Sequence, residues 1–570
     1  MYDLIIQNGK IIDGSGNPWF RADLAVQDGK IVKIARKIEG EAKRIIDAKG
    51  LTVAPGFCDL HTHSDESILY NHYAKSSIHA GVTTEGVGQC GTGAYAFEEG
   101  YEDAIRMDLF QFAQVSLDQI QVNWRTVGDW RKEVEKQGVG INLAPYIPHG
   151  VVRNSVMGPD GKGGERYEPT AEEMERMKKL VRESMEEGAF GMSTGLRYPW
   201  GRNCTTEEII ELSKVVAEYN GIYISHMRSE SDTLIESTHE LVRICEEAGI
   251  PGSVTHHKAK FPENFGKVNE TLRIIDRARA RGLEIICDFY PWVHAAEGNL
   301  GGVFLPYLLS PDMTIPEMQN VLDNVVELIT DGETWAKVKA GVHGDFEKEN
   351  QRNEQRKKDL AKYGITAPAL WNQGTFNYIV YSPTYPELEH KNLIEAARIL
   401  GFEDYMDAAR KIYLDDQGAT LTAGAIMAEE DVVTVLKHPY SSISTDGAAF
   451  DRKPDLTSPI LWAHPRNYGT FAKVLGEYAR DCKYLRLEEA VRKMTSLPMN
   501  FLGITDRGLL REGMWADITI FNADTIQNKA TFANPAVYPD GIEYVLVNGA
   551  VALDHGQETG SLSGKVLWRK

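Results

Sequence analysis

The sequence has few cysteines and no long apolar run. Its 570 residues include only six cysteines, and no two of them form a CxxC pair, so a disulfide scaffold is not expected. A membrane-spanning helix needs about 18 or more consecutive apolar residues, and no segment approaches that length. The first residues lack a basic cluster followed by an apolar stretch, which argues against a secretory signal peptide. We therefore expect a cytoplasmic protein with reduced thiols.

Positive charge is also scarce. Asp and Glu number 82 against 62 Lys and Arg, which gives a formal net charge of -20. A surface this negative repels phosphate backbones and anionic lipids, so we expect neither nucleic acid nor a membrane as a partner. A small anionic substrate stays compatible with this charge, because a local cationic pocket can override the global field. The sequence leaves the formation of a homo-oligomer open.

Hairpin signals occur at both ends of the chain. Asn8-Gly9 and Asp28-Gly29 separate β-rich runs near the start, and Asn548-Gly549 does so near the end. Asn-Gly and Asp-Gly indicate hairpins because both turn residues must accept positive φ. Neither end has enough strands to bury a sheet alone. We therefore predict one small β-sandwich built from residues 1–54 and 501–570, with a large domain, 55–500, inserted between them.

The middle of the chain alternates between short apolar strands and helices. Thr170 and Thr205 each precede a glutamate by three residues, which is the capping-box signature of a helix start. Eight strands with intervening helices predict an α/β fold, a closed parallel (β/α)8 barrel of the TIM type. The predicted strands are 53–63, 82–87, 141–146, 189–193, 222–226, 252–256, 284–290 and 441–446.

The regular spacing of the strands is interrupted once. About 150 residues separate Tyr290 from Ser441, far more than a connecting helix needs. Long loops in barrels usually serve the active site, so we predict an inserted lid or subdomain over about 293–365. The charged stretch 346–352 within it is expected to be a solvated helix.

Side chains that bind metals stand at the ends of five predicted strands. Active sites of such barrels lie at the carboxyl ends of the strands, so these residues should converge. Because alternate residues of a strand face the same side, both histidines of the first strand should point into the barrel mouth. The mixture of donors suits Zn²⁺, and six donors predict either two metals or one tight ion with a looser second position. The set is His61, His63, Cys90, His226, His256 and Asp446.

Several motifs resemble the amidohydrolase superfamily and, within it, the N-acyl-D-amino-acid deacylase (D-aminoacylase) branch. The resemblance runs over nearly the whole chain and is weakest over 293–430. The motifs that carry it include His61-Thr62-His63 after Pro55-Gly56-Phe57, Gly88-Gln89-Cys90-Gly91, Ser225-His226-Met227-Arg228, Thr255-His256-His257-Lys258, Ser444-Thr445-Asp446-Gly447 and His464-Pro465-Arg466.

The resemblance implies a particular arrangement of metal ligands. Hydantoinases and dihydroorotases of this superfamily bridge two metals with a carboxylated lysine on the fourth strand, and residues 189–193 contain no lysine. In the D-aminoacylase branch a cysteine takes the bridging or shared role, here Cys90. The resemblance implies that Cys90, His226 and His256 hold a tight zinc ion. It places His61, His63 and Asp446 around the second position.

The same resemblance implies the reaction, which is hydrolysis of N-acyl-D-amino acids to a D-amino acid and a carboxylate. Zinc lowers the pKa of its water towards about 7, and Asp446 is expected to act as general base and then as acid. The free carboxylate of the substrate needs a cation or strong donors. The resemblance assigns a clamp to Lys258, Tyr198 and Arg466, and Tyr290 at the end of the seventh strand is a further candidate.

Two other functions stay open at this point. The first is hydrolysis of a different amide, such as a cyclic amide or a dipeptide, and the missing strand-four lysine counts against the cyclic substrates. The second is a non-catalytic scaffold that keeps the barrel for assembly. Scaffolds of this kind usually lose metal ligands, and all six candidates are present here.

Overall fold

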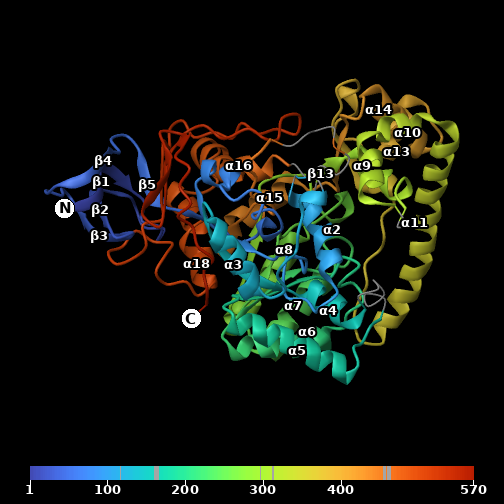
Figure 1. Ribbon diagram of the computed structural model, residues 1–570, viewed down its shortest axis with the longest axis horizontal. Coiled ribbons are helices and arrows are strands. Elements are labelled where there is room, and N and C mark those ends of the chain that lie inside the picture. The colour runs from blue at the N-terminus through green and yellow to red at the C-terminus, as the bar shows by residue number, and fades with distance from the viewer. Residues whose placement is uncertain are drawn as a thin grey trace.

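The computed structural model describes residues 1–113, 115, 117–158, 166–295, 297–310, 313–453, 458 and 464–569. Within these residues the chain forms a terminal sheet at one end of the molecule, a barrel in the centre and a helical unit at the other end (Figure 1). No helix among the described residues has both the length and the apolar character that crossing a bilayer requires.

Strands from both ends of the chain pair in one nine-stranded sheet. Ile518 of the C-terminal part lies opposite Pro55 of the N-terminal part, in an antiparallel pair. Asp28 and Asn548 have φ values of 51° and 50°, as the predicted hairpin turns between β2 and β3 and between β18 and β19 require. The hairpin predicted at Asn8-Gly9 is wrong: both residues lie within β1, where Asn8 has a φ of 62° and the register with β2 shifts between Ile6 and Gly9. The domain boundaries at residues 54 and 501 stay predictions. The strands are β1 (Tyr2–Ile11), β2 (Phe20–Gln27), β3 (Lys30–Ala35), β4 (Ala42–Asp47), β5 (Thr52–Pro55), β17 (Ile518–Phe521), β18 (Ile542–Val547), β19 (Ala550–Asp554) and β20 (Gln557–Glu558).

Eight parallel strands form the barrel sheet, in the order β16-β12-β11-β10-β9-β8-β7-β6. A parallel bridge between Thr62 and Gly447 joins its two ends, so the predicted barrel fold is confirmed. The residues of these strands are buried on both faces of the sheet, as is usual for parallel strands that are covered by helices. The strands are β6 (Phe57–Asp59), β7 (Val82–Val87), β8 (Asn142–Pro148), β9 (Gly191–Gly195), β10 (Ile222–His226), β11 (Gly252–Val254), β12 (Ile285–Phe289) and β16 (Ser441–Ile443).

Some strands differ from the prediction at their ends. The run 53–63 divides at Gly56 into β5, which joins the terminal sheet, and β6, which joins the barrel. β11 and β16 end before His256 and Asp446, and these two residues have positive φ, 33° and 50°. Left-handed backbone cannot continue a strand, so both side chains are presented from the turns that follow.

Helices surround the barrel, and their predicted starts are partly correct. Thr170 forms the complete capping box with Glu173. Thr205 accepts only the backbone N–H of Glu208, because the Glu208 carboxylate lies against His149 and Arg153 instead. The helices of the barrel are α1 (Lys75–His79), α2 (Glu102–Ala113), α3 (Val127–Gln137), α4 (His149–Met157), α5 (Ala171–Glu186), α6 (Thr206–Glu218), α7 (Leu234–Ala248), α8 (Val268–Ala280), α15 (Glu429–Lys437), α16 (Arg466–Lys473) with a π-helix over Val474–Asp481, α17 (Leu487–Lys493) and α18 (Ser496–Phe501).

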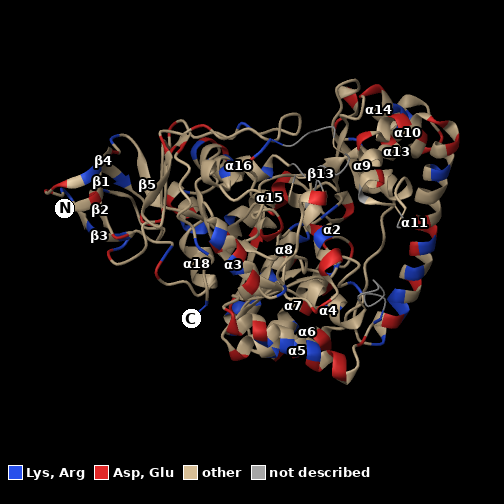
Figure 2. Cartoon of the chain, in the orientation of Figure 1, with Lys and Arg blue, Asp and Glu red and all other residues tan. Residues whose placement is uncertain are grey.

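The inserted unit is longer than predicted. One apolar core joins residues from Leu300 to Tyr413, and β15 (Leu421–Gly424) pairs with both β13 (Glu297–Asn299) and β14 (Asn377–Tyr381). The unit therefore continues well past residue 365, because its sheet is completed only by β15. The charged stretch 346–352 lies in the long outer helix α11, in which acidic and basic residues are interspersed (Figures 1 and 2). The helices are α9 (Ile315–Asp323), α10 (Val325–Thr330), α11 (Gly332–Ala361), α12 (Gln373–Phe376), α13 (Leu393–Leu400) and α14 (Tyr405–Asp415).

Candidate metal centre

The six predicted donors meet at the carboxyl end of the barrel. Cys90 Sγ lies 3.5 Å from His61 Nε2, 3.7 Å from His226 Nδ1 and 3.6 Å from His256 Nε2. Asp446 Oδ1 lies 3.3 Å from His61 Nε2 and 3.5 Å from His63 Nε2. All six side chains are buried. Residues from five separate segments of the chain thus form one cluster.

The geometry of the cluster fits zinc. In a tetrahedral site with Zn–S near 2.3 Å and Zn–N near 2.0–2.1 Å, a sulfur and a nitrogen ligand lie about 3.5 Å apart, close to the Cys90 contacts. The donors form two sets that share Cys90, namely His61, His63, Cys90 and Asp446, and Cys90, His226 and His256. His226 Nδ1 and His256 Nε2 are only 2.8 Å apart, somewhat closer than two ligands of one ion. The assignment of each donor as a ligand stays a prediction.

Asp446 and Cys90 are held in their anionic forms, and they act in turn on two of the histidines. Burial raises the pKa of Asp446, but Arg466 and His61 outweigh burial and hold this pKa well below its usual value. Burial likewise raises the pKa of Cys90, and His61, His226 and His256 together hold it well below that of a free thiol. Burial lowers the pKa of His61 and of His63, but Cys90 and Asp446, joined at His61 by Asp288, outweigh burial, so both pKa values are raised, that of His63 to about 10. The carboxylate and the thiolate are the forms that bind metals.

The backbone around Cys90 is tightly constrained. Cys90 has a φ of 55°, and its carbonyl oxygen accepts a hydrogen bond from Trp200 Nε1 at 3.1 Å. A Cβ atom at position 195, on the end of β9, would lie 1.9 Å from the same oxygen. Glycine is therefore needed at 195 so that the two backbone segments can approach.

We expect Gly195→Ala to displace the Cys90 backbone, to lower the zinc content and to lower the Tm. Overpacking of this kind costs about 1–3 kcal/mol of stability. Thermal unfolding and metal analysis of the purified variant measure both effects. Gly344→Ala in α11 is the control, because its Cβ would meet nothing within 4 Å. Equal zinc contents in the two variants would contradict the proposed constraint.

Two buried carboxylates, Asp288 and Glu230, for which no role was predicted, contact the ring nitrogens of the histidines that face away from Cys90. Asp288 Oδ1 is 3.3 Å from His61 Nδ1. Glu230 Oε1 is 2.9 Å from His256 Nδ1, and Glu230 Oε2 is 3.5 Å from His226 Nε2. A sequence signal existed for Glu230, since it follows His226 by four residues. That signal is weak, because Glu230 lies beyond the end of β10, in the loop before α7.

The four residues predicted to bind the substrate lie beside the donors. Arg466 is 1% exposed, so it is not a surface residue, and its Nη1 lies 2.9 Å from Asp446 Oδ2. Lys258 Nζ donates to Glu230 Oε1 at 2.6 Å. Both cations flank the Tyr290 ring, with Arg466 4.7 Å and Lys258 5.0 Å from its centroid. The Tyr198 ring lies 4.6 Å from that of His226.

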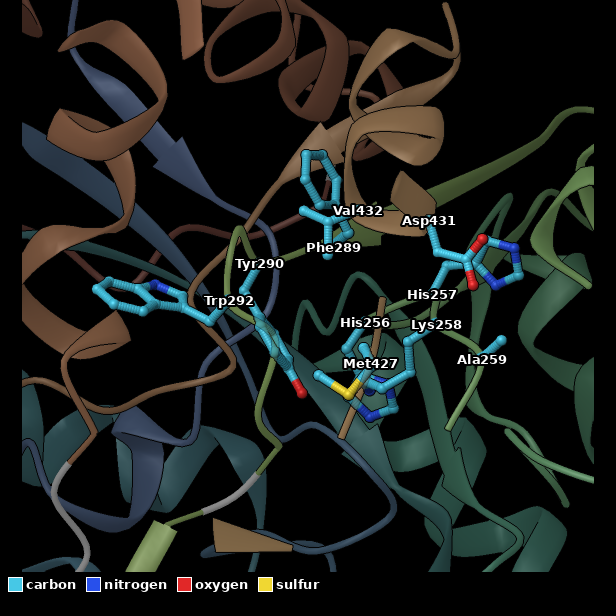
Figure 3. Close-up of a pocket in the computed structure, with 10 residues that line it drawn as sticks. All are labelled: His256, His257, Lys258, Ala259, Phe289, Tyr290, Trp292, Met427, Asp431 and Val432. Atoms are coloured by element: carbon cyan, nitrogen blue, oxygen red, sulfur yellow. The ribbon is translucent and has the colours of Figure 1, made fainter. Parts of the chain in front are cut away.

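A pocket adjoins the donors on the side of Lys258. Figure 3 shows His256, Tyr290 and Met427 together in it, with His257 directed away from His256 towards Asp431. His257 Nε2 lies 2.7 Å from Thr271 Oγ1, so this ring packs against α8. The Tyr290 hydroxyl is buried without a hydrogen-bond partner among the described residues, which leaves it free for a ligand.

A second cluster of donors does not have the character of a metal site. His149, Cys204 and Glu208 are buried close together. However, Arg153 Nε donates to both oxygens of the Glu208 carboxylate, at 3.0 Å to Oε1 and 3.2 Å to Oε2. His149 Nε2 lies 2.8 Å from Oε1 of the same carboxylate. A guanidinium at that distance already neutralises the carboxylate. His149 is therefore a hydrogen-bonded core residue.

The barrel and the donors at its strand ends define a metal-dependent hydrolase of the (β/α)8 type. The chain belongs to the amidohydrolase family, whose model matches residues 44–553. It is 31% identical to a D-aminoacylase of Alcaligenes xylosoxydans xylosoxydans, over 100% of this chain and 98% of that protein. It is 30% identical to an N-acyl-D-glutamate deacylase of the same organism, over 96% and 93% of the two chains. The predicted resemblance to the D-aminoacylase branch is confirmed.

Solved structures agree with the sequence comparisons. The crystal structure of N-acyl-D-glutamate deacylase from Bordetella bronchiseptica, complexed with zinc and a phosphonate inhibitor, superposes with a TM-score of 0.73 at 28% identity over the whole of both chains. A crystal structure of D-aminoacylase gives a TM-score of 0.72, also at 28% identity over the whole of both chains.

Proposed function

We propose that the protein is a zinc-dependent amidohydrolase that cleaves N-acyl-D-amino acids to a D-amino acid and a carboxylate. The observation that carries this proposal is the buried Cys90 thiol, which lies 3.5 to 3.7 Å from histidines of two donor sets. The relatives named D-aminoacylase and N-acyl-D-glutamate deacylase support the substrate class. The D configuration rests on these relatives alone.

Cys90, His226 and His256 would hold the tight ion, and His61, His63 and Asp446 would surround a second, weaker position. Zinc bound in such a site lowers the pKa of water towards about 7 and polarises a carbonyl group. The ionised Asp446 carboxylate would accept the proton of the attacking water and return it to the departing nitrogen. Arg466, whose Nη1 lies 2.9 Å from Asp446 Oδ2, holds this carboxylate in place.

The substrate carboxylate would be bound on the Lys258 side of the donors. Lys258 and Lys260 both contact Glu230, so two ammonium groups face a single carboxylate beside the donors. The Tyr290 hydroxyl has no other partner among the described residues and adds a donor. Tyr198, beside His226, and Arg466, beside Asp446, would complete the predicted clamp.

We expect Lys258→Met to raise the KM for N-acyl amino acids with a free α-carboxylate by about 10–100-fold, the worth of a hydrogen bond to a charged group. The corresponding methyl esters carry no charge and should lose much less. Initial rates on matched acid and ester substrates, with the zinc content verified, measure the difference. An equal rise in KM for both would remove Lys258 from the clamp.

The proposed reaction is tested by metal analysis followed by amine-release assays on matched N-acetyl-D- and N-acetyl-L-amino acids. We expect bound zinc and release from the D compounds. Release from cyclic amides alone would support the alternative substrate class. β9 argues against that class, because Gly191–Gly195 carries no lysine to be carboxylated. Absence of all hydrolysis would support a scaffold, against which the convergence of six donors argues.

A further inference from the structure

One buried carboxylate contacts both the predicted zinc site and the predicted substrate clamp. Glu230 lies between β10 and α7 and is 5% exposed. Its two oxygens contact four side chains. Oε1 is 2.9 Å from His256 Nδ1 and 2.6 Å from Lys258 Nζ, while Oε2 is 3.5 Å from His226 Nε2 and 2.6 Å from Lys260 Nζ.

The two histidines face Glu230 and Cys90 with opposite ring nitrogens. His226 directs Nδ1 to Cys90 and Nε2 to Glu230, whereas His256 directs Nε2 to Cys90 and Nδ1 to Glu230. A nitrogen that binds a metal must carry its lone pair, so the proton of the neutral ring resides on the other nitrogen. A carboxylate at that second nitrogen fixes both the tautomer and the ring orientation. The contacts of Glu230 with His226 and His256 have the distances of ion pairs but do not have the geometry of hydrogen bonds.

The backbone ties the same segments together. Lys260 N donates to the carbonyl oxygen of Glu230 at 2.7 Å, so the segment after β10 and the segment after β11 are joined at this point. Asp288 stands behind His61 in the same manner, 3.3 Å from its Nδ1. The histidines of each donor set are therefore contacted by a carboxylate outside that set. Among the described residues, only Glu230 also contacts Lys258 and Lys260.

We propose that Glu230 is a positioning residue, which fixes His226 and His256 for zinc and holds Lys258 at the substrate clamp. This inference rests on the proposed function. It predicts that one substitution weakens metal binding and alters recognition of the substrate carboxylate together. Glu230→Gln preserves the shape of the side chain and removes its charge, so both histidines lose their anionic partner and both lysines lose their counter-ion.

Zinc affinity tests the proposal without reference to turnover. We expect competition with a chelating dye to give a Kd for zinc about 10–100-fold higher in Glu230→Gln than in the wild type, as for other residues that orient metal ligands. The cobalt-substituted variant should also show a shifted visible absorption spectrum, because the two imidazoles change orientation. Glu230→Asp, which retains the charge at a shorter reach, should give an intermediate Kd.

Glu240→Gln is the matched control. Glu240 is a carboxylate in α7 whose side chain is only 11% exposed, but it pairs with Arg228 and contacts no donor among the described residues. Zinc affinity and cobalt spectrum should be unchanged in this variant, and thermal unfolding of the zinc-free proteins verifies that all variants fold. Wild-type zinc affinity and spectrum in Glu230→Gln, or equal losses in both variants, would overturn the inference. Failure of the wild type to bind zinc would overturn the proposed function itself.

Discussion

Replacement of Asp446 by Asn should leave zinc at the tight site and lower kcat by about 10²–10⁴-fold, the usual contribution of a positioned acid or base. Asn keeps the shape of Asp but cannot accept a proton from water. Asp446 is also absent from the set of Cys90, His226 and His256, so the tight ion should be retained. The zinc content and single-substrate kinetics of the purified variant measure the two effects.

Asp451→Asn is the control for this prediction. Asp451 lies in the same segment after β16, but its carboxylate accepts backbone N–H groups of Tyr73 and Lys75 and takes no part in the cluster. Its kcat should match that of the wild type. Wild-type turnover in Asp446→Asn would exclude Asp446 as the acid–base residue.

Replacement of Cys90 by Ala should remove the tight zinc ion. Four ligands of a structural zinc site are worth about 10–16 kcal/mol in total, so one ligand is worth roughly 3 kcal/mol, which is about a hundredfold or more in the Kd. Loss of activity should follow the loss of metal. Titration of the zinc-free protein, followed by activity at each zinc concentration, measures both.

Cys245→Ala controls for the removal of a buried thiol. Cys245 lies in α7 and is fully buried, but it belongs to none of the donor groups among the described residues. Its zinc affinity should be unchanged, whatever stability it loses. A zinc affinity for Cys90→Ala equal to that of Cys245→Ala would show that Cys90 is not a ligand.

Much of the fold was predictable from local pattern. β7 and β10 have the predicted bounds, because short buried strands are marked by β-branched residues and by the turns around them. The sheet built from both termini was predictable because neither end has enough strands to bury a sheet alone. The extent of the inserted unit could not be predicted, since β15 joins it through pairing with β13 and β14, and pairing partners leave no local signal.

The candidate site was predictable where strand ends bear donors, and less so elsewhere. All six predicted donors converge, since parallel strands bring their carboxyl ends to one face. The contacts of Glu230 with two histidines and two lysines depend on the paths of two loops. The burial of Arg466 beside Asp446 could not be predicted, because it depends on how α16 packs against the barrel.

The most direct test of the account is X-ray absorption at the zinc edge of protein loaded with one equivalent of zinc. Cys90, His226 and His256 predict one sulfur at about 2.3 Å together with nitrogen or oxygen ligands at about 2.0–2.1 Å. Loss of the sulfur shell in Cys90→Ala would assign it to this residue. A first shell composed only of nitrogen and oxygen in the wild type would contradict the shared thiolate, and with it the proposed metal centre.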